Sequence, residues 1–416
     1  MRRSKVLGLL LALVFSLTVL AQGQTYADLH SFTGGRDGAD PLTGLTMDRA
    51  GNLYGTTSEG GYMGGVCGNL GCGTVFRLSP KNGSWIFTLL YEFQGGQDGE
   101  SPQAAVTIGP DGAVYGTTLY GGAFGCNVGY GCGIAFKLTP GTSICHTALC
   151  SWHETIIYDF ADDPHGFATP YGGLIFDQEG NIYGTAFAGG VGVCARACGA
   201  VYQLTPSHGE WTLTPIYIFT GGDDGASPMS TLLRDSHGNL YGTSSLGGIN
   251  QSGTVFELVP SGQTWTFHLL YSFRGQEDGS NPMVGLVMDS AGNLYGNTAI
   301  GAANFGGAIF QLSPQGVGWS FAVLDSPAGG LYAPLNIDSH GNLYGTTFAG
   351  GASGLGRVFE LTPSGNGWIQ HDLYSFSGAD GALADSSVTL DNSGRLYGTT
   401  SSGGGNQAGV VWELTP

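Results

Sequence analysis

A tyrosine-glycine pair recurs seven times along this chain, and this recurrence constrains the fold more than any other feature. The tyrosines stand 49 to 68 residues apart and are Tyr54, Tyr115, Tyr183, Tyr241, Tyr295, Tyr344 and Tyr397. Such a period is typical of a β-propeller blade and exceeds that of a leucine-rich or hexapeptide solenoid. Nothing between the tyrosines shows the 3.6-residue periodicity of a helix. The sequence therefore predicts an all-β repeat protein.

Each repeat predicts four strands separated by turns. In the fourth repeat, the predicted strands cover residues 230–234, 239–244, 253–259 and 264–273. A turn of the form D-x-x-G-N or D-x-x-G-R separates the first two strands and begins at Asp48, Asp177, Asp235, Asp289, Asp338 and Asp391. An Asp side chain can cap such a turn, and its glycine can take the positive φ that closes a hairpin. The second repeat departs from the pattern, with Gly109 in place of the Asp.

The fourth predicted strand of most repeats carries Trp, then Tyr six residues later, then Phe two residues beyond. The first example is Trp85, Tyr91 and Phe93. Even offsets place all three side chains on one face of a strand. They could form a ladder on which sugars stack, but their repetition favours packing of each blade against the next.

The ends of the repeat array are complementary. The predicted domain starts with an extra fourth strand over residues 26–32, and the sequence finishes after a third strand over residues 410–414. Pairing of these two segments would complete the last blade and leave no unpaired strand edge. We therefore predict a closed seven-bladed β-propeller of four-stranded antiparallel blades.

The repeated motifs resemble those of a known family. F-x-G-G-x-D-G-x-x-P is followed by D-x-x-G-N-L-Y-G-T-T, a Gly-rich loop and G-T-V-F-x-L-x-P, and this order resembles the GloVer tandem repeat of exported bacterial proteins. The resemblance implies a propeller-like fold and export. Members often carry C-terminal surface-sorting segments, which we do not see here, so we do not carry over anchoring. The resemblance implies no established activity and no catalytic residues.

The first 21 residues predict a removable signal peptide, with a basic start, an apolar run and small residues before the expected cut. The apolar run is shorter than the roughly twenty residues of a membrane-spanning helix. We expect residues 22–416 to form a single propeller domain, secreted to the periplasm or the extracellular space, monomeric and not inserted in a membrane. The formal net charge of −18 argues against nucleic acid as a partner and favours solubility.

The eight cysteines fall into four close pairs. They are Cys67 with Cys72, Cys126 with Cys132, Cys145 with Cys150, and Cys194 with Cys198. In an exported chain, such pairs predict local disulfides that stiffen Gly-rich loops. A zinc site is the alternative, but the gaps are unequal and the pairs lie in different places along the chain. We therefore predict disulfides and no metal at the cysteines.

The links between repeats carry recurrent carboxylates. GGRDGADP (34–41) is the first such link, and the set comprises Asp37, Asp98, Asp224, Asp278 and Asp380. In an antiparallel blade, these links emerge on the same face as the loops between the second and third strands. A ring of hard oxygen donors could bind calcium or hydrogen-bond a sugar. We favour the alternative that each Asp caps its own Asp-Gly turn, and we predict no required cofactor.

Two links break the pattern, in the third and sixth repeats. They read ADDPHGFATP (161–170) and SPAGGLYAP (326–334), and they mark His165, Phe167 and Tyr332 as candidate ligand-binding residues. The Gly-rich loops on this face lack the G-K-[ST] of a phosphate-binding loop. Variable loops on one face of a rigid scaffold are common places for specificity.

No catalytic constellation emerges from the sequence, which lacks G-x-S-x-G and H-E-x-x-H. We favour a non-enzymatic binding or scaffold propeller that recognises a glycan or an extracellular protein on its loop-rich face. The alternatives are an extracellular polysaccharide lyase or hydrolase with an axial active site, and a purely structural surface or matrix protein. A cluster of non-repeated polar residues at one axial mouth would distinguish a specialised site from a plain scaffold.

Overall fold

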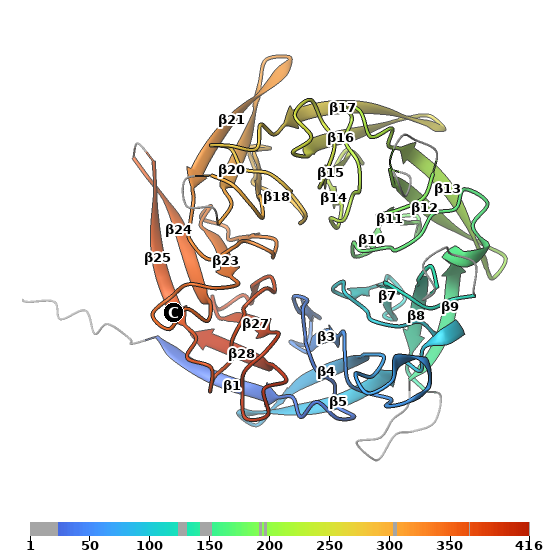
Figure 1. Cartoon of the computed structure of the whole chain (residues 1–416), viewed down its shortest axis with the longest axis vertical. Helices are drawn as coiled ribbons and strands as arrows, with labels where there is room; N and C mark the ends of the chain where they lie inside the picture. The colour runs from blue at the N-terminus through green and yellow to red at the C-terminus, as the bar shows by residue number, and fades with distance from the viewer. Residues whose placement is uncertain are drawn as a thin grey trace, which may run out of the picture.

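The computed structural model describes residues 24–123, 131–141, 152–190, 194, 198–302, 306–365 and 367–415. The predicted signal peptide, Cys126, Cys145 and Cys150 lie outside the described residues. Within them, 28 strands form seven four-stranded antiparallel sheets. Figure 1 shows these sheets arranged as blades in a ring. The predicted seven-bladed β-propeller is confirmed.

The blades are numbered by the order of their tyrosine-glycine pairs. Blades 1 to 3 comprise β2 (Thr46–Met47), β3 (Leu53–Thr57), β4 (Thr74–Lys81) and β5 (Ser84–Glu92); β6 (Thr107–Ile108), β7 (Val114–Thr118), β8 (Ile134–Thr139) and β9 (His153–Asp159); β10 (Ile175–Phe176), β11 (Ile182–Ala186), β12 (Ala200–Ser207) and β13 (Glu210–Ile218). Blades 4 and 5 comprise β14 (Leu233–Arg234), β15 (Leu240–Ser244), β16 (Thr254–Ser261) and β17 (Thr264–Ser272); β18 (Val287–Met288), β19 (Leu294–Asn297), β20 (Ile309–Gln315) and β21 (Gly318–Asp325).

Blades 6 and 7 complete the ring. They comprise β22 (Asn336–Ile337), β23 (Leu343–Thr347), β24 (Arg357–Ser364) and β25 (Gly367–Ser375); β26 (Thr389–Leu390), β27 (Leu396–Thr400), β28 (Val410–Thr415) and β1 (Thr25–Ser31). The helical elements of the described residues are three 3-10 turns, at Gly65–Cys67, Gly96–Asp98 and Phe160–Asp162. None of the described helical segments is long and apolar enough to cross a bilayer.

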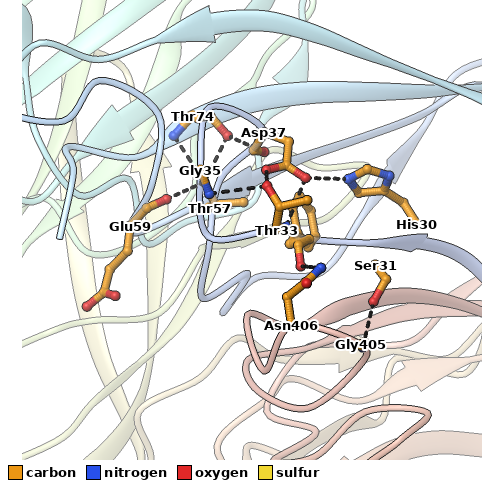
Figure 2. Close-up of polar contacts among 11 residues, drawn as sticks. His30, Ser31, Thr33, Gly35, Asp37, Thr57, Glu59, Thr74, Gly405 and Asn406 are labelled. Carbon is orange, nitrogen blue, oxygen red and sulfur yellow. Dashed lines mark hydrogen bonds and ion pairs between the residues drawn. The ribbon is translucent and has the colours of Figure 1, made fainter. Parts of the chain in front are cut away.

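Ring closure follows the prediction. β1 pairs with β28 in antiparallel register, from Thr25 opposite Thr415 to Ser31 opposite Val410. The loop between β27 and β28 adds side-chain contacts, because the Asn406 amide donates to the Phe32 carbonyl at 3.2 Å (Figure 2). The first strand of the chain therefore serves as the outermost strand of the last blade.

The glycine of each tyrosine-glycine pair is required by an aromatic side chain of the neighbouring strand. Gly55 lies opposite Phe76, and a Cβ on Gly55 would stand 2.5 Å from the Phe76 ring. The other blades repeat this contact, with Gly116 against Phe136, Gly184 against Tyr202, Gly242 against Phe256, Gly296 against Phe310, Gly345 against Phe359 and Gly398 against Trp412. The glycine thus lets a large ring lie directly on the backbone of the second strand.

The tryptophan ladder packs between blades, as predicted. Trp265 of blade 4 lies edge-on to Tyr183 of blade 3, with ring centroids 6.0 Å apart. Trp319 and Trp368 make the same contact with the tyrosines of their preceding blades. These rings belong to the seams between blades and do not form a free stacking surface.

The turn-capping prediction is also confirmed. Asp48 accepts hydrogen bonds from the backbone N–H groups of Ala50 and Asn52, at 2.8 and 2.9 Å. Asp177, Asp235, Asp289, Asp338 and Asp391 cap their turns in the same way. In blade 2, where Gly109 replaces the first Asp, Asp111 accepts from the Ala113 N–H at 3.1 Å instead.

A continuous set of hydrogen bonds joins each blade to the next, and we call it the belt. The first residue after each tyrosine-glycine pair donates its side-chain hydrogen to a backbone carbonyl of the following blade, at 2.9 to 3.4 Å. The donors are Thr56, Thr117, Thr185, Thr243, Asn297, Thr346 and Thr399, and the acceptors are Ala104, Gly172, Ser230, Val284, Ala333, Ser386 and Thr43. Thr399 donates from the last blade to the first, which closes the belt.

The belt explains a difference from the predicted strand lengths. Residues 230–234 were expected to form the first strand of blade 4, but β14 covers only Leu233–Arg234. The Ser230 carbonyl accepts from Thr185 of the preceding blade at 3.1 Å. The backbone upstream of β14 therefore bonds to the neighbouring blade rather than to its own sheet.

Candidate functional site: the axial mouth

The links between blades and the loops between second and third strands share one face, as predicted. Ala39 of the first link forms a β-bridge with Glu59 of the loop after β3, and Ala226 does the same with Leu246 in blade 4. Each link then turns toward the axis and leads into the first strand of the next blade. We call the opening at the axis on this face the mouth.

The mouth is a cavity of about 260 Å³ lined by residues from all seven blades. Its outer ring takes one residue from each blade, at the same place in the link just before the first strand. These residues are Leu42, Gln103, Tyr171, Met229, Met283, Tyr332 and Asp385. Their variety is informative, because the structure around them repeats while their chemistry does not. The outer ring of the mouth therefore has two aromatic rings, one amide and one carboxyl group beside one leucine and two methionines.

The two tyrosines lie in blades 3 and 6, the blades whose links break the repeat pattern. Tyr332 is 45% exposed and lies edge-on to Phe348, with ring centroids 5.5 Å apart. Tyr171 lies edge-on to Phe187 at 5.7 Å. Burial raises the pKa of the Tyr171 hydroxyl, which therefore stays protonated at neutral pH. Each tyrosine is thus held by a phenylalanine that the other blades lack.

Asp385 supplies the carboxyl group of the mouth. Burial, with a smaller contribution from the charge of Asp40, raises the pKa of Asp385 to about 7. Its Oδ1 is buried without a hydrogen-bond partner among the described residues. The neighbouring Asp40 is better satisfied, since its Oδ2 accepts from the Ser58 hydroxyl at 2.7 Å. Asp385 is therefore the mouth's unsatisfied acceptor, and near neutral pH it can also donate a proton.

The five predicted acids of the links lie away from the mouth, beside the outermost strands. Asp224 accepts from the Tyr217 hydroxyl at 3.0 Å and from the Thr220 backbone N–H at 2.8 Å. Asp98, Asp278 and Asp380 accept the same two hydrogen bonds, one from a tyrosine hydroxyl and one from a backbone N–H shortly before them in the chain. Their carboxylates stabilise turns, which agrees with the favoured turn-cap interpretation.

In Asp37, both carboxylate oxygens are hydrogen-bonded to nearby residues. It accepts from the Thr33 backbone N–H at 3.0 Å and from the Thr33 hydroxyl, and it lies 3.1 Å from the His30 Nε2 (Figure 2). His30 here takes the place of the tyrosine that donates to Asp98, Asp224, Asp278 and Asp380. No group of three or more metal-ligating side chains is found among the described residues. Calcium binding by these acids stays the alternative to the favoured turn-cap interpretation.

The remaining candidates have different surroundings. Phe167 is fully buried in the hydrophobic core, and His165 is stacked on it with ring centroids 5.2 Å apart. Asp163 accepts from the Tyr158 hydroxyl at 2.8 Å, so this irregular link keeps the turn cap of the regular ones. Among the eight predicted ligand-binding residues, Tyr332 is the one that lines the mouth.

Two of the four predicted disulfides are present in the described residues, Cys67–Cys72 and Cys194–Cys198. Cys132 is also disulfide-bonded, but its predicted partner Cys126 lies outside the described residues. The Cys67–Cys72 bond closes the loop after β3, which carries the exposed side chains of Tyr62, Met63, Val66 and Leu70.

The chain is thus a seven-bladed propeller whose mouth is lined by residues that differ from blade to blade. The Gloeobacter/Verrucomicrobia repeat matches residues 12–190 and 126–332 of this chain. These matches cover more than half of the sequence, so the chain belongs to this repeat family, as the motifs indicated. No curated protein matches it significantly.

Three solved structures are similar to this chain at low sequence identity. A protein from Bacteroides uniformis ATCC 8492, provisionally assigned as a 6-phosphogluconolactonase, is 15% identical over 83% of this chain and 86% of its own, with a TM-score of 0.49. A protein from Thermus thermophilus, provisionally assigned as an oxidoreductase (glucose dehydrogenase), is 15% identical over 94% and 100%, with a TM-score of 0.45. A gluconolactonase from Xanthomonas campestris is 16% identical over 63% and 74%, with a TM-score of 0.38. None of these similarities carries an inference about activity.

Proposed function

We propose that this protein is a non-enzymatic glycan-binding propeller that takes one sugar ring into its mouth. The observation that carries the proposal is the non-repeated ring of Gln103, Tyr171, Tyr332 and Asp385 on a repeated scaffold. A cavity of about 260 Å³ is slightly smaller than the roughly 300 Å³ at which pockets for drug-sized ligands begin. Its size therefore suits a single small ring.

The chemistry of the mouth matches a sugar. A pyranose presents an apolar C–H face and a rim of hydroxyl groups. Tyr171 and Tyr332 offer amphipathic aromatic surfaces for the apolar face. Gln103 offers both hydrogen-bond donors and acceptors, and the carboxyl group of Asp385, which also lines the cavity, can accept a hydrogen bond from a sugar hydroxyl.

The test is binding of the purified chain to a broad glycan array, with calcium and with a chelator. We expect saturable binding in both conditions, because the link carboxylates serve as turn caps. Tyr332→Ala and Asp385→Leu should each lower affinity at least tenfold. The matched control is Ile249→Ala, which changes a 67% exposed side chain of a loop on the same face outside the mouth.

An array without binding in either condition would overturn glycan recognition and leave a protein partner or a structural role. Binding that Tyr332→Ala and Asp385→Leu leave unchanged would place the ligand elsewhere. Loss of binding in the chelator would show that the link carboxylates bind calcium.

A second candidate function, polysaccharide hydrolysis, is favoured by Asp385 alone. A carboxyl group with a pKa of about 7 has the acidity expected of a general acid at neutral pH. This candidate predicts product release that Asp385→Asn abolishes, and binding without product would reject it.

We also propose that the chain acts outside the cytoplasm, as a monomer and without insertion in a membrane. The Cys67–Cys72 and Cys194–Cys198 disulfides support an oxidising compartment. N-terminal sequencing of the exported protein tests the predicted cleavage after residue 21, and sedimentation analysis tests the monomer.

A further inference from the structure

Arg234 is a charged residue at a position where the other six blades carry an apolar one. It is the second residue of the first strand of blade 4, and its counterparts are Met47, Ile108, Phe176, Met288, Ile337 and Leu390. These counterparts pack in the seam with the preceding blade, as Phe176 does against Tyr115 at 4.9 Å. Arg234 therefore places a guanidinium group in the seam between blades 3 and 4.

The guanidinium group of Arg234 has no hydrogen-bonding or ion-pairing partner within the described part of the chain, and its Nε is buried. An unsatisfied buried donor costs free energy comparable to a lost hydrogen bond, and more when the group is charged. Since Met or Ile fills the same position in other blades, packing alone does not explain the arginine.

The corresponding seam between blades 7 and 1 provides an internal comparison. Its cation, Arg395, forms an ion pair with Asp391 at 2.9 Å and with Glu413 at 3.4 Å. In blade 3, the counterpart of Glu413 is the neutral Gln203, which lies opposite Tyr183 in the ladder of β11 and β12. One seam thus neutralises its arginine internally, whereas the other leaves its arginine available.

Arg234 lines a notch of about 250 Å³ on the face opposite the mouth, together with Tyr183, Gln203, His237 and Trp265. This face carries the hairpin turns between first and second strands, where His237 lies. We propose that the notch binds an acidic saccharide whose carboxylate is held by Arg234. A guanidinium fork matches a carboxylate with two parallel hydrogen bonds. The Trp265 indole and the Gln203 amide supply an aromatic surface and polar contacts for the sugar ring.

The acids of the notch do not compete for Arg234. Asp177 already accepts four hydrogen bonds, from the backbone N–H groups of Glu179 and Asn181, the Asn181 amide and the Tyr183 hydroxyl. Glu179 is exposed and forms no ion pair with Arg234. Because the whole chain carries a formal net charge of −18, general electrostatic attraction does not favour anions. Binding of an acidic sugar would therefore report this specific site.

The test is calorimetric titration of the full chain at low ionic strength with trimers of galacturonic acid and of glucuronic acid. The methyl-esterified trimers are the neutral match. We expect at least one acid trimer to bind, and its ester to bind at least tenfold more weakly. Arg234→Met, which installs the residue found in blades 1 and 5, and Arg234→Gln should both lose at least tenfold in affinity.

The matched control is Arg395→Asn, which removes one cation from the same face and installs the residue that five other blades carry there. It should bind like the unchanged protein, and so should Tyr332→Ala, because the mouth lies on the opposite face. Arg234→Met should also raise the melting temperature, since it removes a half-buried cation whose buried Nε has no hydrogen-bond partner.

Failure of both acid trimers to bind better than their esters would overturn the proposal. So would equal binding by Arg234→Met and Arg234→Gln, or an equal loss in Arg395→Asn. These outcomes are independent of the glycan array, because the mouth variants test a different cavity.

Discussion

The mouth and the belt lie next to each other on the same segments, yet they differ completely in composition. The belt uses six threonines and one asparagine at seven equivalent positions, and all seven donate the same hydrogen bond. The outer ring of the mouth uses five residue types at seven equivalent positions. The carbonyl groups that accept the hydrogen bonds of the belt belong to the residues that directly follow those of the outer ring. The side chain at the mouth is therefore free to vary without loss of the bond between blades.

The largest loss of stability is expected for a substitution at the joint that closes the ring, because the belt depends on that closure. Phe32 follows β1, has no exposed surface, and lies edge-on to Phe76 of blade 1 at 5.2 Å. Phe32→Ala should lower the free energy of unfolding by about 3–5 kcal/mol, through lost burial and a cavity. Denaturant titration measures this, with Ile249→Ala as the control. A loss below about 1 kcal/mol would show that closure does not depend on this contact.

A smaller effect should follow removal of one belt hydrogen bond. Thr399 donates to the carbonyls of Pro41 and Thr43, at 2.8 and 3.0 Å. Thr399→Val keeps the shape and leaves buried carbonyls unsatisfied, so stability should fall by about 1–3 kcal/mol. Thr399→Ser keeps the hydroxyl and should recover most of the loss. Equal stability of the Val and Ser variants would contradict a role for the hydroxyl.

The seam between blades 1 and 2 contains a residue that differs from its counterparts in other blades and lowers the stability of the folded state. Glu154 of blade 2 occupies the position that Phe267 occupies in blade 4, where Phe267 stacks on Tyr217 of blade 3. The Tyr91 hydroxyl of blade 1 donates a hydrogen bond to the Glu154 Oε2 at 3.1 Å. Burial, followed by the influence of Asp98, raises the pKa of Glu154 to about 9. The folded state therefore keeps a proton that the unfolded chain releases above its ordinary pKa of 4.5.

The sign of the pH effect follows from that proton. Stability should decrease as pH rises from about 4.5 toward 9, because the folded state binds more protons than the unfolded state over that window. Glu154→Gln should remove this dependence and stabilise the protein at pH 8 by on the order of 1 kcal/mol. Melting curves at pH 5 and pH 8 measure the difference. A gain that is the same at both pH values would argue against the raised pKa.

The smallest effect is expected in the mouth itself. The side chain of Leu42 is partly exposed, and the equivalent residue of blade 2 is Gln103. Leu42→Gln therefore installs a residue that this position already accepts in another blade. Stability should change by less than about 0.5 kcal/mol, as for surface substitutions that remove no specific contact. The pattern of glycans bound should change nevertheless. A loss above about 1 kcal/mol would mean that the mouth residues also hold the ring together.

The sequence was sufficient for features that repeat. The tyrosine-glycine pairs and the capped turns predicted blade number and hairpins, because each depends on local chemistry present in nearly every copy. Closure was predicted from the ends, because the first segment supplies the fourth strand that the last repeat lacks. The first strands were predicted too long, since the belt that shortens them joins residues far apart in sequence, such as Thr185 and Ser230.

The mouth was harder to predict for the opposite reason. Its residues are recognisable only by what fails to repeat, and they become a set only when the blades converge. Tyr332 was found because its link is irregular. Asp385 stands at the end of the regular link GADGALAD, and its burial depends on neighbours from another blade. Aligning the repeats by position and asking where polarity changes would have found Asp385, and it would also have found Arg234.

The pairing of β1 with β28 has a consequence for how the protein is made. The strand that is synthesised first can find its place only after the strand that is synthesised last has formed. A chain interrupted before Val410 would leave β1 without its partner and its backbone groups exposed. The joint between β1 and β28 therefore couples closure of the ring to synthesis of the last blade, because the edge of β28 stays unpaired until β1 docks on it.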